Sequence, residues 1–258
     1  MILTIDIGNT NIVLGLCEGN EIRFTGRCAS DPGKTEDEYA MTIKGVLELY
    51  GYTAQQVEGG IISSVVPALR TVLHRAMERL TGHSFLLVGT GIKTGLRIRT
   101  ENPSLLGTDL VCDAVAAVAD YPTPLVIFDM GTATTVSVVD EQGCYLGGMI
   151  VPGLQVAADA LAARAAQLPA FTLAAPSHLI GRNTVESMQG GTLYGHAAVV
   201  DGLLTRLEGE LGSSLTAIAT GGLAELVVPH CLREVQLDVN LQLRGLLIIY
   251  HKNQRARR

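Results

Sequence analysis

The chain has 258 residues, of which 47% are hydrophobic and 17% are charged, and its formal net charge is −6. No run approaches the ~18 uninterrupted apolar residues of a membrane helix, and the acidic balance argues against a general nucleic-acid surface. The five cysteines form no C-x-x-C pair, which argues against a disulfide framework and a zinc site. We therefore expect a globular cytoplasmic protein that binds neither membrane nor nucleic acid.

The N-terminal residues predict a strand rather than a secretion signal. Residues 2–5 read Ile-Leu-Thr-Ile, which is typical of a strand, and they lack a preceding basic segment. A polar turn and a second apolar strand at 11–15 complete a hairpin, and a further turn leads into a third strand. The same pattern returns at residues 126–139. Each half of the chain is therefore expected to open with a three-stranded meander.

Both hairpin turns carry an Asp and a Gly in register, namely Asp6 with Gly8 and Asp129 with Gly131. A turn that holds a nucleotide triphosphate presents backbone N–H groups and leaves room for Mg²⁺. A carboxylate approaches phosphate only through a cation, since two negative charges repel. Two ordinary hairpins would explain either turn alone, whereas the matched pair favours phosphate binding. The chain has neither a P-loop nor a dinucleotide fingerprint.

Helix signals follow the first meander. Thr35 and Glu38 have the spacing of a capping box. Pro67 suits the start of a second helix and Gly82 suits its end. The strand-to-helix step that precedes this second helix returns at residues 215–223.

These signals predict an α/β protein with two similar halves. The prolines at positions 122 and 124 interrupt helix and mark the boundary. We expect one half at residues 1–120 and the other at 121–258. The basic stretch at residues 251–258 is interpreted as a frayed, solvated tail.

Five segments, in the same order, resemble the type III pantothenate kinases. They lie at residues 6–11, 101–109, 129–135, 148–153 and 220–222. Together they span nearly the whole chain. The resemblance places the protein in the acetate and sugar kinase, actin and heat-shock ATPase superfamily. It implies a duplicated actin-like, ribonuclease H-like fold with a cleft between the two halves.

The resemblance also implies an activity, which is the ATP-dependent phosphorylation of pantothenate to 4'-phosphopantothenate, the first step of coenzyme A biosynthesis, by a homodimer. Mg²⁺ and a monovalent cation, K⁺ or NH₄⁺, are its implied cofactors. Asp129 is implied to bind the monovalent cation, while Asp6, at a strand end, suits Mg²⁺ or its water. The residues implied to contact ATP are Asp6, Ile7, Gly8, Asn9, Thr10, Asn11, Ile12, Val13 and Thr132.

Asp109 is the implied general base, because phosphoryl transfer needs a carboxylate within reach of the acceptor hydroxyl. N-capping of the helix predicted to start there is the alternative, and one residue is able to do both. Thr184 is implied to reach pantothenate from the partner subunit, although Asn183 or Thr184 also suits a helix cap. The residues implied to contact the acceptor are Thr100, Gly107, Thr108, Asp109, Leu110 and Thr184.

Two acceptor positions depart from the family pattern. Thr100 stands where the family usually has Tyr, and Leu110 stands where it usually has Arg. An Arg offers a charged, forked donor that Leu cannot replace. Two other hypotheses therefore stay open, a kinase for a different small hydroxyl compound and a nucleotide-binding regulator without turnover. The intact Asp109 weighs against the regulator.

Two histidines, His178 and His196, lack the spacing of metal ligands. We interpret both as structural or surface residues.

Overall fold

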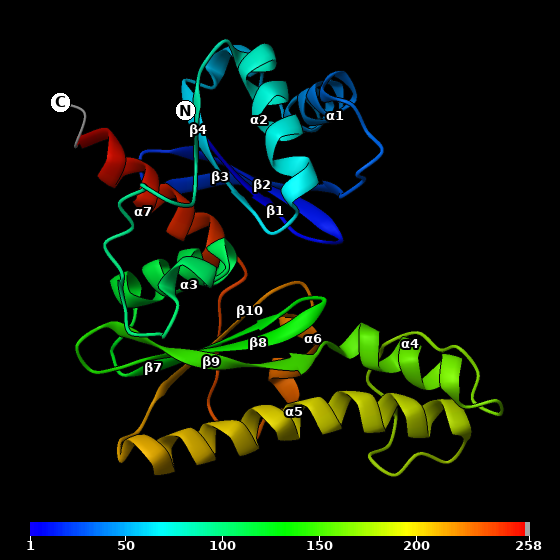
Figure 1. The fold of residues 1–258 in the computed structure, drawn as a ribbon. Helices are drawn as coiled ribbons and strands as arrows, with labels where there is room; N and C mark the ends of the chain where they lie inside the picture. The colour runs from blue at the N-terminus through cyan, green and yellow to red at the C-terminus, as the bar shows by residue number, and fades with distance from the viewer. Residues whose placement is uncertain (256–258) are drawn as a thin grey trace. The chain divides into compact units, whose positions relative to one another are not determined.

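The computed structural model describes residues 1–255, which form two compact units. The first unit comprises Met1–Leu96, Glu101–Ala116 and the described chain from Asn240 onward. The second comprises Arg97–Thr100 and Ala117–Val239. Each unit contains one mixed sheet, and helices cover its faces (Figure 1).

The first unit is built on a five-stranded sheet in the order β3-β2-β1-β4-β5. Its strands are β1 (Ile2–Ile7), β2 (Asn11–Glu18), β3 (Glu21–Ala29), β4 (Gly59–Ser64) and β5 (Phe85–Leu87). Its helical elements are α1 (Glu36–Leu49), η1 (Ala54–Gln56), α2 (Pro67–Thr81), η2 (Pro103–Leu105), the greater part of α3 (Thr108–Asp120) and α7 (Leu241–Arg255). β1 pairs antiparallel with β2 and parallel with β4.

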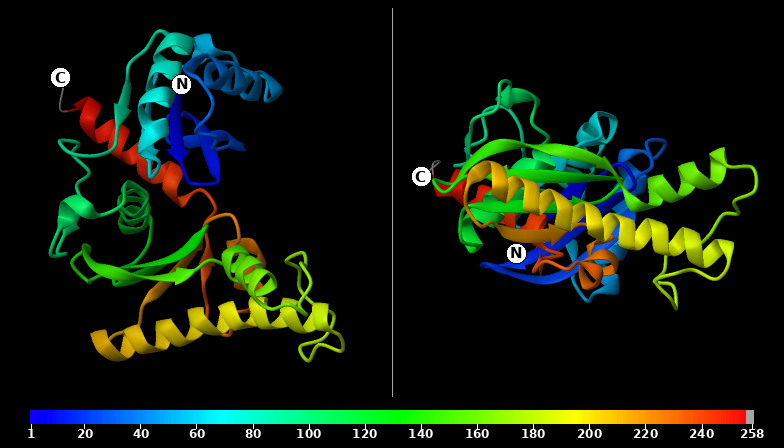
Figure 2. Two further views of the ribbon diagram at one scale, coloured as in Figure 1. Left: turned by 45° about the vertical axis from the view of Figure 1, so that its right-hand side comes forward. Right: turned by 90° about the horizontal axis from the view of Figure 1, so that it is seen from below.

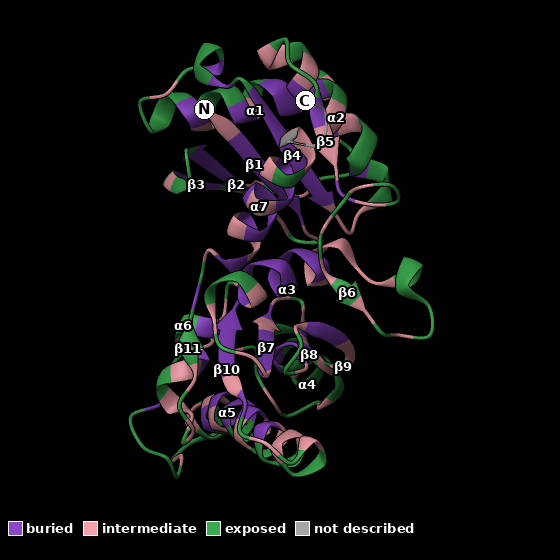
Figure 3. Ribbon diagram, turned by 90° about the vertical axis from the view of Figure 1, so that its left-hand side faces the viewer, coloured by how far each residue is buried: buried purple, intermediate pink, exposed green. Residues whose placement is uncertain are grey.

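Alternation along β1 decides which helices cover which face of this sheet. Leu3, Ile5 and Ile7 are fully buried and pack into one core with residues of α1 and α2. Thr4 and Asp6 leave the opposite face, on the side of the sheet that α7 contacts. Figure 3 shows the resulting burial as purple along β1 and β4.

The helix signals at residues 35–82 are confirmed. The Thr35 side chain accepts from the backbone of Glu38 at 3.3 Å, and the Glu38 side chain accepts from the backbone of Thr35 at 2.8 Å. Pro67 is the first residue of α2, and Gly82 ends that helix with a φ of 73°. Only glycine adopts this left-handed conformation without strain.

The second unit contains a six-stranded sheet in the order β11-β10-β7-β8-β9-β6. Its strands are β6 (Arg97–Ile98), β7 (Leu125–Met130), β8 (Ala133–Val139), β9 (Cys144–Pro152), β10 (Thr216–Thr220) and β11 (Gln236–Leu237). Its helical elements are the end of α3, α4 (Leu154–Arg164), α5 (Thr184–Leu211), α6 (Ala224–Val227) and η3 (Val228–His230). The long helix α5 runs along the sheet (Figure 2), and residues of both form one core.

The predicted pair of meanders is confirmed as β1-β2-β3 and β7-β8-β9. The strand-to-helix step is repeated less closely. β4 leads into the 15-residue helix α2, whereas β10 leads into α6, which has only 4 residues. The second copy has therefore kept its strands better than its helix.

The C-terminal segment differs from the expectation in two ways. Residues 251–255, interpreted as part of a frayed tail, belong to α7, while residues 256–258 of that stretch lie outside the described residues. In addition, α7 packs with the first unit rather than the second. The physical reason is the apolar face of α7, whose Leu243, Leu246 and Leu247 are buried.

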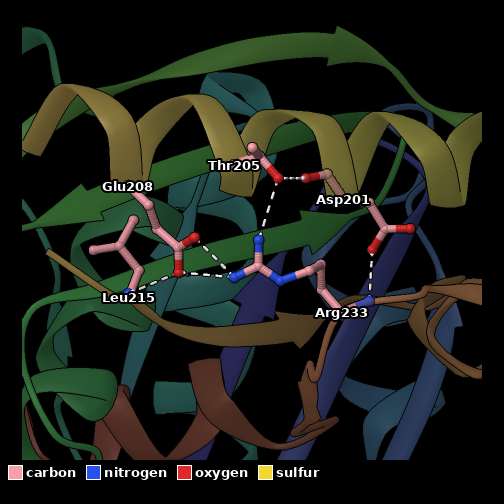
Figure 4. A network of polar contacts seen from close by, with 5 residues as sticks. All are labelled: Asp201, Thr205, Glu208, Leu215 and Arg233. Atoms are coloured by element: carbon pink, nitrogen blue, oxygen red, sulfur yellow. Dashed lines mark hydrogen bonds and ion pairs between the residues drawn. The ribbon is translucent and has the colours of Figure 1, made fainter. Parts of the chain in front are cut away.

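One polar network fastens the chain before β11 to α5 (Figure 4). The Arg233 guanidinium donates to both carboxylate oxygens of Glu208, at 2.8 and 2.9 Å, and this contact lowers the pKa of Glu208. The Asp201 carboxylate accepts from the backbone of Arg233 at 3.0 Å. These bonds hold the segment that leads from η3 to β11 against the helix.

Within the described residues, no helix has the length and apolar content needed to cross a membrane.

Candidate active site

The first hairpin turn combines a buried base with an exposed tip. Asp6 lies near the end of β1 and is 7% exposed, whereas Asn9 and Thr10 at the tip are exposed. The Gly8 backbone is held from both sides, since its N–H donates to the Asn11 carbonyl at 3.0 Å and its carbonyl accepts from the Ser30 hydroxyl at 2.6 Å. The turn is therefore rigid and presents polar groups outward.

The nine residues implied to contact ATP differ in how far their side chains are exposed. The side chains of Ile7 and Ile12 are fully buried in the core of the first unit. They anchor the hairpin and leave only their backbone for a ligand. Thr132 is exposed and belongs to the second turn, in the second unit.

Asp109 is the second residue of α3, so it lies inside the first helical turn rather than at the N-cap. Asp109 is therefore not the N-cap of α3, and the capping interpretation was wrong. The Oδ1 atom of Asp109 is buried and has no hydrogen-bond partner among the described residues. Burial raises the pKa of Asp109, and backbone N–H groups at the helix start offset only part of that effect.

Gly107 allows this carboxyl group its position. A Cβ atom on Gly107 would lie 2.3 Å from Asp109 Oδ1, a distance that would force the carboxylate to move. The lack of a side chain at Gly107 therefore leaves room for the Asp109 carboxylate.

Asp6, assigned to the nucleotide, and Asp109, assigned to the acceptor, lie near the same side chain of the first unit, the thiol of Cys112. Burial raises the pKa of the Cys112 thiol well above its ordinary value, and the charges of Asp113, Asp6 and Asp109 raise it further. Asp6, from the nucleotide turn, and Asp109, from α3, therefore both lie near this thiol, which stays protonated at neutral pH.

In the second unit, residues of two neighbouring strands and of the turn after β10 surround the Asp129 carboxyl group closely. Thr135 is its direct partner across the β7–β8 pair, and Thr220 is its partner across the β7–β10 pair. The Thr135 hydroxyl is buried without a hydrogen-bond partner in the described part of the chain. Gly221, with a φ of 89°, approaches so closely that a Cβ would lie 2.4 Å from Asp129 Oδ1.

The surroundings of Asp129 suit a monovalent cation, because carboxylate and hydroxyl oxygens are ligands for hard cations. Among residues 1–255, no group of three or more His, Cys, Asp or Glu side chains is arranged to hold a metal ion. Any cation at Asp129 would therefore depend on neutral oxygens such as that of Thr135.

The second turn is supported from two sides by residues for which the sequence suggested no such role. The Gly153 N–H donates to the Thr132 carbonyl at 3.2 Å, and a Cβ on Gly153 would lie 2.4 Å from the carbonyl oxygens of Gly131 and Thr132. On the other side, His196 of α5 bonds the Thr134 hydroxyl through Nε2 at 2.9 Å. Burial lowers the pKa of His196, which favours its neutral form.

His196 is thus a structural residue, as the sequence indicated, and the exposed His178 is a surface residue. The bond from His196 to Thr134 joins residues far apart in the chain, and only the fold reveals it.

At the start of α5, the structure decides which residue is the helix cap. The Asn183 side chain accepts from the backbone of Glu186 at 2.9 Å, so Asn183 is the cap. Thr184 is exposed and lines a groove of about 540 Å³ between α4 and α5. The apolar side chains of the groove include those of Val151, Leu154, Leu161, Leu168, Met188 and Val199.

The two departures from the family pattern lie in different units. Leu110 follows Asp109 on α3 in the first unit, and Thr100 follows β6 in the second, with its hydroxyl buried and unpartnered among the described residues. Two arginines near Thr100 are already engaged. Arg99 pairs with Asp140 at 3.1 Å, and Arg97 donates to the Gln142 carbonyl.

Comparison with known proteins gives one family. The family model described as type III pantothenate kinase matches residues 2–206. The type III pantothenate kinase of Moorella thermoacetica is 44% identical over 253 residues, which cover 98% of this chain and 100% of that protein. The type III pantothenate kinase of an Exiguobacterium species is 46% identical over 255 residues, which cover 99% of this chain and 100% of that protein.

Similar solved structures are more distant in sequence. The activator of the 2-hydroxyisocaproyl-CoA dehydratase from Clostridium difficile, solved with bound ADPNP, has a TM-score of 0.60 at 16% identity and covers 99% of this chain and 97% of its own. The ROK hexokinase of Thermus thermophilus has a TM-score of 0.53 at 13% identity, with 98% and 99% covered. These similarities show the fold alone and confirm the predicted actin-like class.

Proposed function

The chain belongs to the type III pantothenate kinase family, and we propose that it transfers the γ-phosphoryl group of ATP to pantothenate. The product is 4'-phosphopantothenate, formed in the first step of coenzyme A biosynthesis. The observation that carries this proposal is the buried Oδ1 of Asp109, which has no hydrogen-bond donor among the described residues. An acceptor hydroxyl supplies such a donor, and the carboxylate then takes its proton.

On the nucleotide side, Asp6 through Val13 and Thr132 bind ATP. The rigid backbone of Gly8 and the exposed Asn9 and Thr10 suit the phosphates. Asp6 suits Mg²⁺, held through water, because its carboxylate is a hard oxygen donor beside this turn. When bound, Mg²⁺ neutralises charge on the phosphates.

On the acceptor side, Asp109 is the base, and Gly107, Thr108 and Leu110 surround it in the chain. Burial keeps water away from the carboxylate and raises its pKa, so it accepts a proton more readily than an exposed Asp does. Thr100 and Thr184 complete the proposed acceptor contacts, Thr184 from the partner subunit.

A monovalent cation, K⁺ or NH₄⁺, is proposed at Asp129. The buried hydroxyl of Thr135, unpartnered among the described residues, supports a cation there, because Thr135 lies directly across from Asp129 and its oxygen is a suitable ligand. Asp129 and Thr135 would hold this cation, which would supply positive charge to the site.

The protein is proposed to be a cytoplasmic homodimer. Its five cysteines are free thiols, which suits a reducing compartment. The region around the groove between α4 and α5 exposes large apolar side chains, which suit burial against a second copy. These exposed residues are Ile150, Val156, Leu161, Leu179, Ile180 and Val185.

Product analysis tests the proposed reaction. The protein is incubated with ATP, Mg²⁺, K⁺ and a panel of small hydroxyl compounds that includes pantothenate, and products are identified by mass spectrometry. We expect 4'-phosphopantothenate. A phosphorylated compound other than this one would favour a kinase with a different acceptor, and no product from any compound would favour a regulator.

A different acceptor is the second candidate function, and the residues at Thr100 and Leu110 favour it. If the protein uses pantothenate despite these residues, restoring the family residues should improve its use. We expect Thr100→Tyr with Leu110→Arg to lower the KM for pantothenate roughly tenfold or more, because a charged hydrogen bond is worth about 1.5–3 kcal/mol and each 1.4 kcal/mol is a factor of ten. The KM for ATP should stay unchanged in steady-state assays.

All four members of this mutant cycle are measured, since the two changes need not be additive. Leu105→Arg is the matched control, because it adds the same charge at an exposed position of the same segment. Efficient turnover of pantothenate by the wild type, with no gain in the double variant, would contradict our account of these two positions.

A further inference from the structure

Ser63 and Thr108 join two parts of the first unit that are far apart in sequence. Ser63 is fully buried near the end of β4, and Thr108 is the first residue of α3. Their hydroxyl oxygens lie 2.9 Å apart, and the Thr108 hydroxyl also donates to the Ser64 carbonyl at 3.2 Å. The end of β4 is therefore bonded to the first turn of the helix that carries Asp109.

The number of protons fixes the direction of these bonds. A threonine hydroxyl has one proton, and Thr108 gives it to the Ser64 carbonyl. The Ser63 hydroxyl must then donate to Thr108. One ordered chain results, from the Ser63 hydroxyl through Thr108 to the backbone carbonyl of Ser64.

This hydroxyl chain begins beside the nucleotide turn. Ser63 is the direct neighbour of Asp6 in the parallel pairing of β1 with β4, so both side chains leave the same face of the sheet. At its other end, Thr108 is adjacent to Asp109 in α3. Ser63 thus stands between the residue proposed to hold Mg²⁺ and the residue proposed as base.

We propose that Ser63 is a positioning residue, whose hydroxyl fixes Asp109 relative to Asp6 by holding Thr108 in a single orientation. This inference rests on the role proposed above for Asp109. Phosphoryl transfer depends largely on positioning, because the attacking and leaving oxygens have to lie in line. Without the Ser63 hydroxyl, Thr108 loses its donor, and the first turn of α3 loses a hydrogen bond to β4.

Steady-state kinetics of Ser63→Ala, Thr108→Val and the double variant test this proposal. We expect Ser63→Ala to lower kcat by about threefold to about tenfold, the range for one lost neutral hydrogen bond, and to leave the KM for ATP unchanged. Thr108→Val should lower kcat at least as much. The double variant should be no slower than Thr108→Val alone, because Ser63 acts through Thr108.

Thr4→Val is the matched control. It removes another fully buried hydroxyl of the same unit, one that donates to the Gly15 carbonyl at 3.1 Å. We expect wild-type kcat even if its unfolding midpoint falls. A fall in kcat equal to that of Ser63→Ala would overturn the proposal, because any lost buried hydroxyl would then have the same effect.

Wild-type kcat in Ser63→Ala would overturn the proposal, and so would effects of Ser63→Ala and Thr108→Val that simply multiply in the double variant. Asp109→Asn is measured beside them to separate the two levels of inference. Activity of Asp109→Asn would contradict the role of Asp109 as base. An inactive Asp109→Asn together with a Ser63→Ala variant of wild-type kcat would contradict only the positioning role of Ser63. If Ser63→Ala does not fold, Ser63→Cys, a weak donor of similar size, is judged by the same outcomes.

Discussion

Asp109→Asn is expected to lower kcat by about 10²-fold to about 10⁴-fold, the usual loss when a general base is removed. Asn keeps the size of the side chain and cannot accept the proton of the acceptor hydroxyl. Isothermal titration calorimetry with ATP should give a dissociation constant close to that of the wild type. The nucleotide turn keeps its bonds in this variant, since Gly8 is held by Asn11 and Ser30.

The same variant should be at least as stable as the wild type. Burial raises the pKa of Asp109, so the fold disfavours its charged form, and the wild type should become more stable as pH falls through this raised pKa. A neutral Asn removes that penalty at pH 7. A thermal unfolding midpoint well below that of the wild type, with loss of ATP binding, would instead indicate a structural role. Asp120→Asn, the same change at the other end of α3, is the matched control and should keep full activity.

Local signals in the sequence were enough to predict the elements that carry the two turns. The capping box of Thr35 and Glu38, the helix start at Pro67 and the left-handed end at Gly82 depend on neighbours within a few residues. Periodicity and the repeated Asp and Gly likewise predicted both meanders. Helix caps, helix ends and strand periodicity can be predicted from sequence because each depends on residues close together in the chain.

The contacts that shape the site were not predictable in this way. The bond between Ser63 and Thr108 and the bond between Thr134 and His196 join residues 45 and 62 positions apart. Serine and threonine are common in strands and helices without any such role, so no local pattern marks these residues. The placement of α7 depended equally on tertiary packing, because its contacts are with β1, β2 and β4 at the other end of the chain.

Boundary errors also affected the interpretation of the site. The cap hypothesis for Asp109 required the helix to begin one residue after it, whereas α3 begins at Thr108. At α5, Asn183 and Thr184 were equally good caps in the sequence, and the hydrogen bond from the backbone of Glu186 to Asn183 distinguishes them. Helix ends shift easily by one residue, since the competing first-turn bonds are similar in strength.

Removal of K⁺ and NH₄⁺ is expected to lower kcat by about 10²-fold or more, a loss comparable to that of one preorganised electrostatic group. Na⁺ should replace them poorly, as implied by the family's cation at the Asp129 position. The measurement is kcat in buffers free of all monovalent metals and ammonium, with each chloride salt then added back at constant ionic strength. Full activity in the cation-free buffer would remove the proposed site.

Thr135→Val locates the cation more sharply than removal does. Val keeps the branched shape and lacks the hydroxyl that lies, buried and unpartnered among the described residues, directly across from Asp129. If that oxygen is a ligand, the K⁺ concentration for half-maximal activity should rise, and saturating K⁺ should restore most of the rate. Glu141→Gln, at an exposed position just beyond β8, is the control and should leave the K⁺ dependence unchanged. A lower rate at every K⁺ concentration, with an unchanged half-maximal value, would assign Thr135 to the packing of the turn and leave Asp129 without this partner.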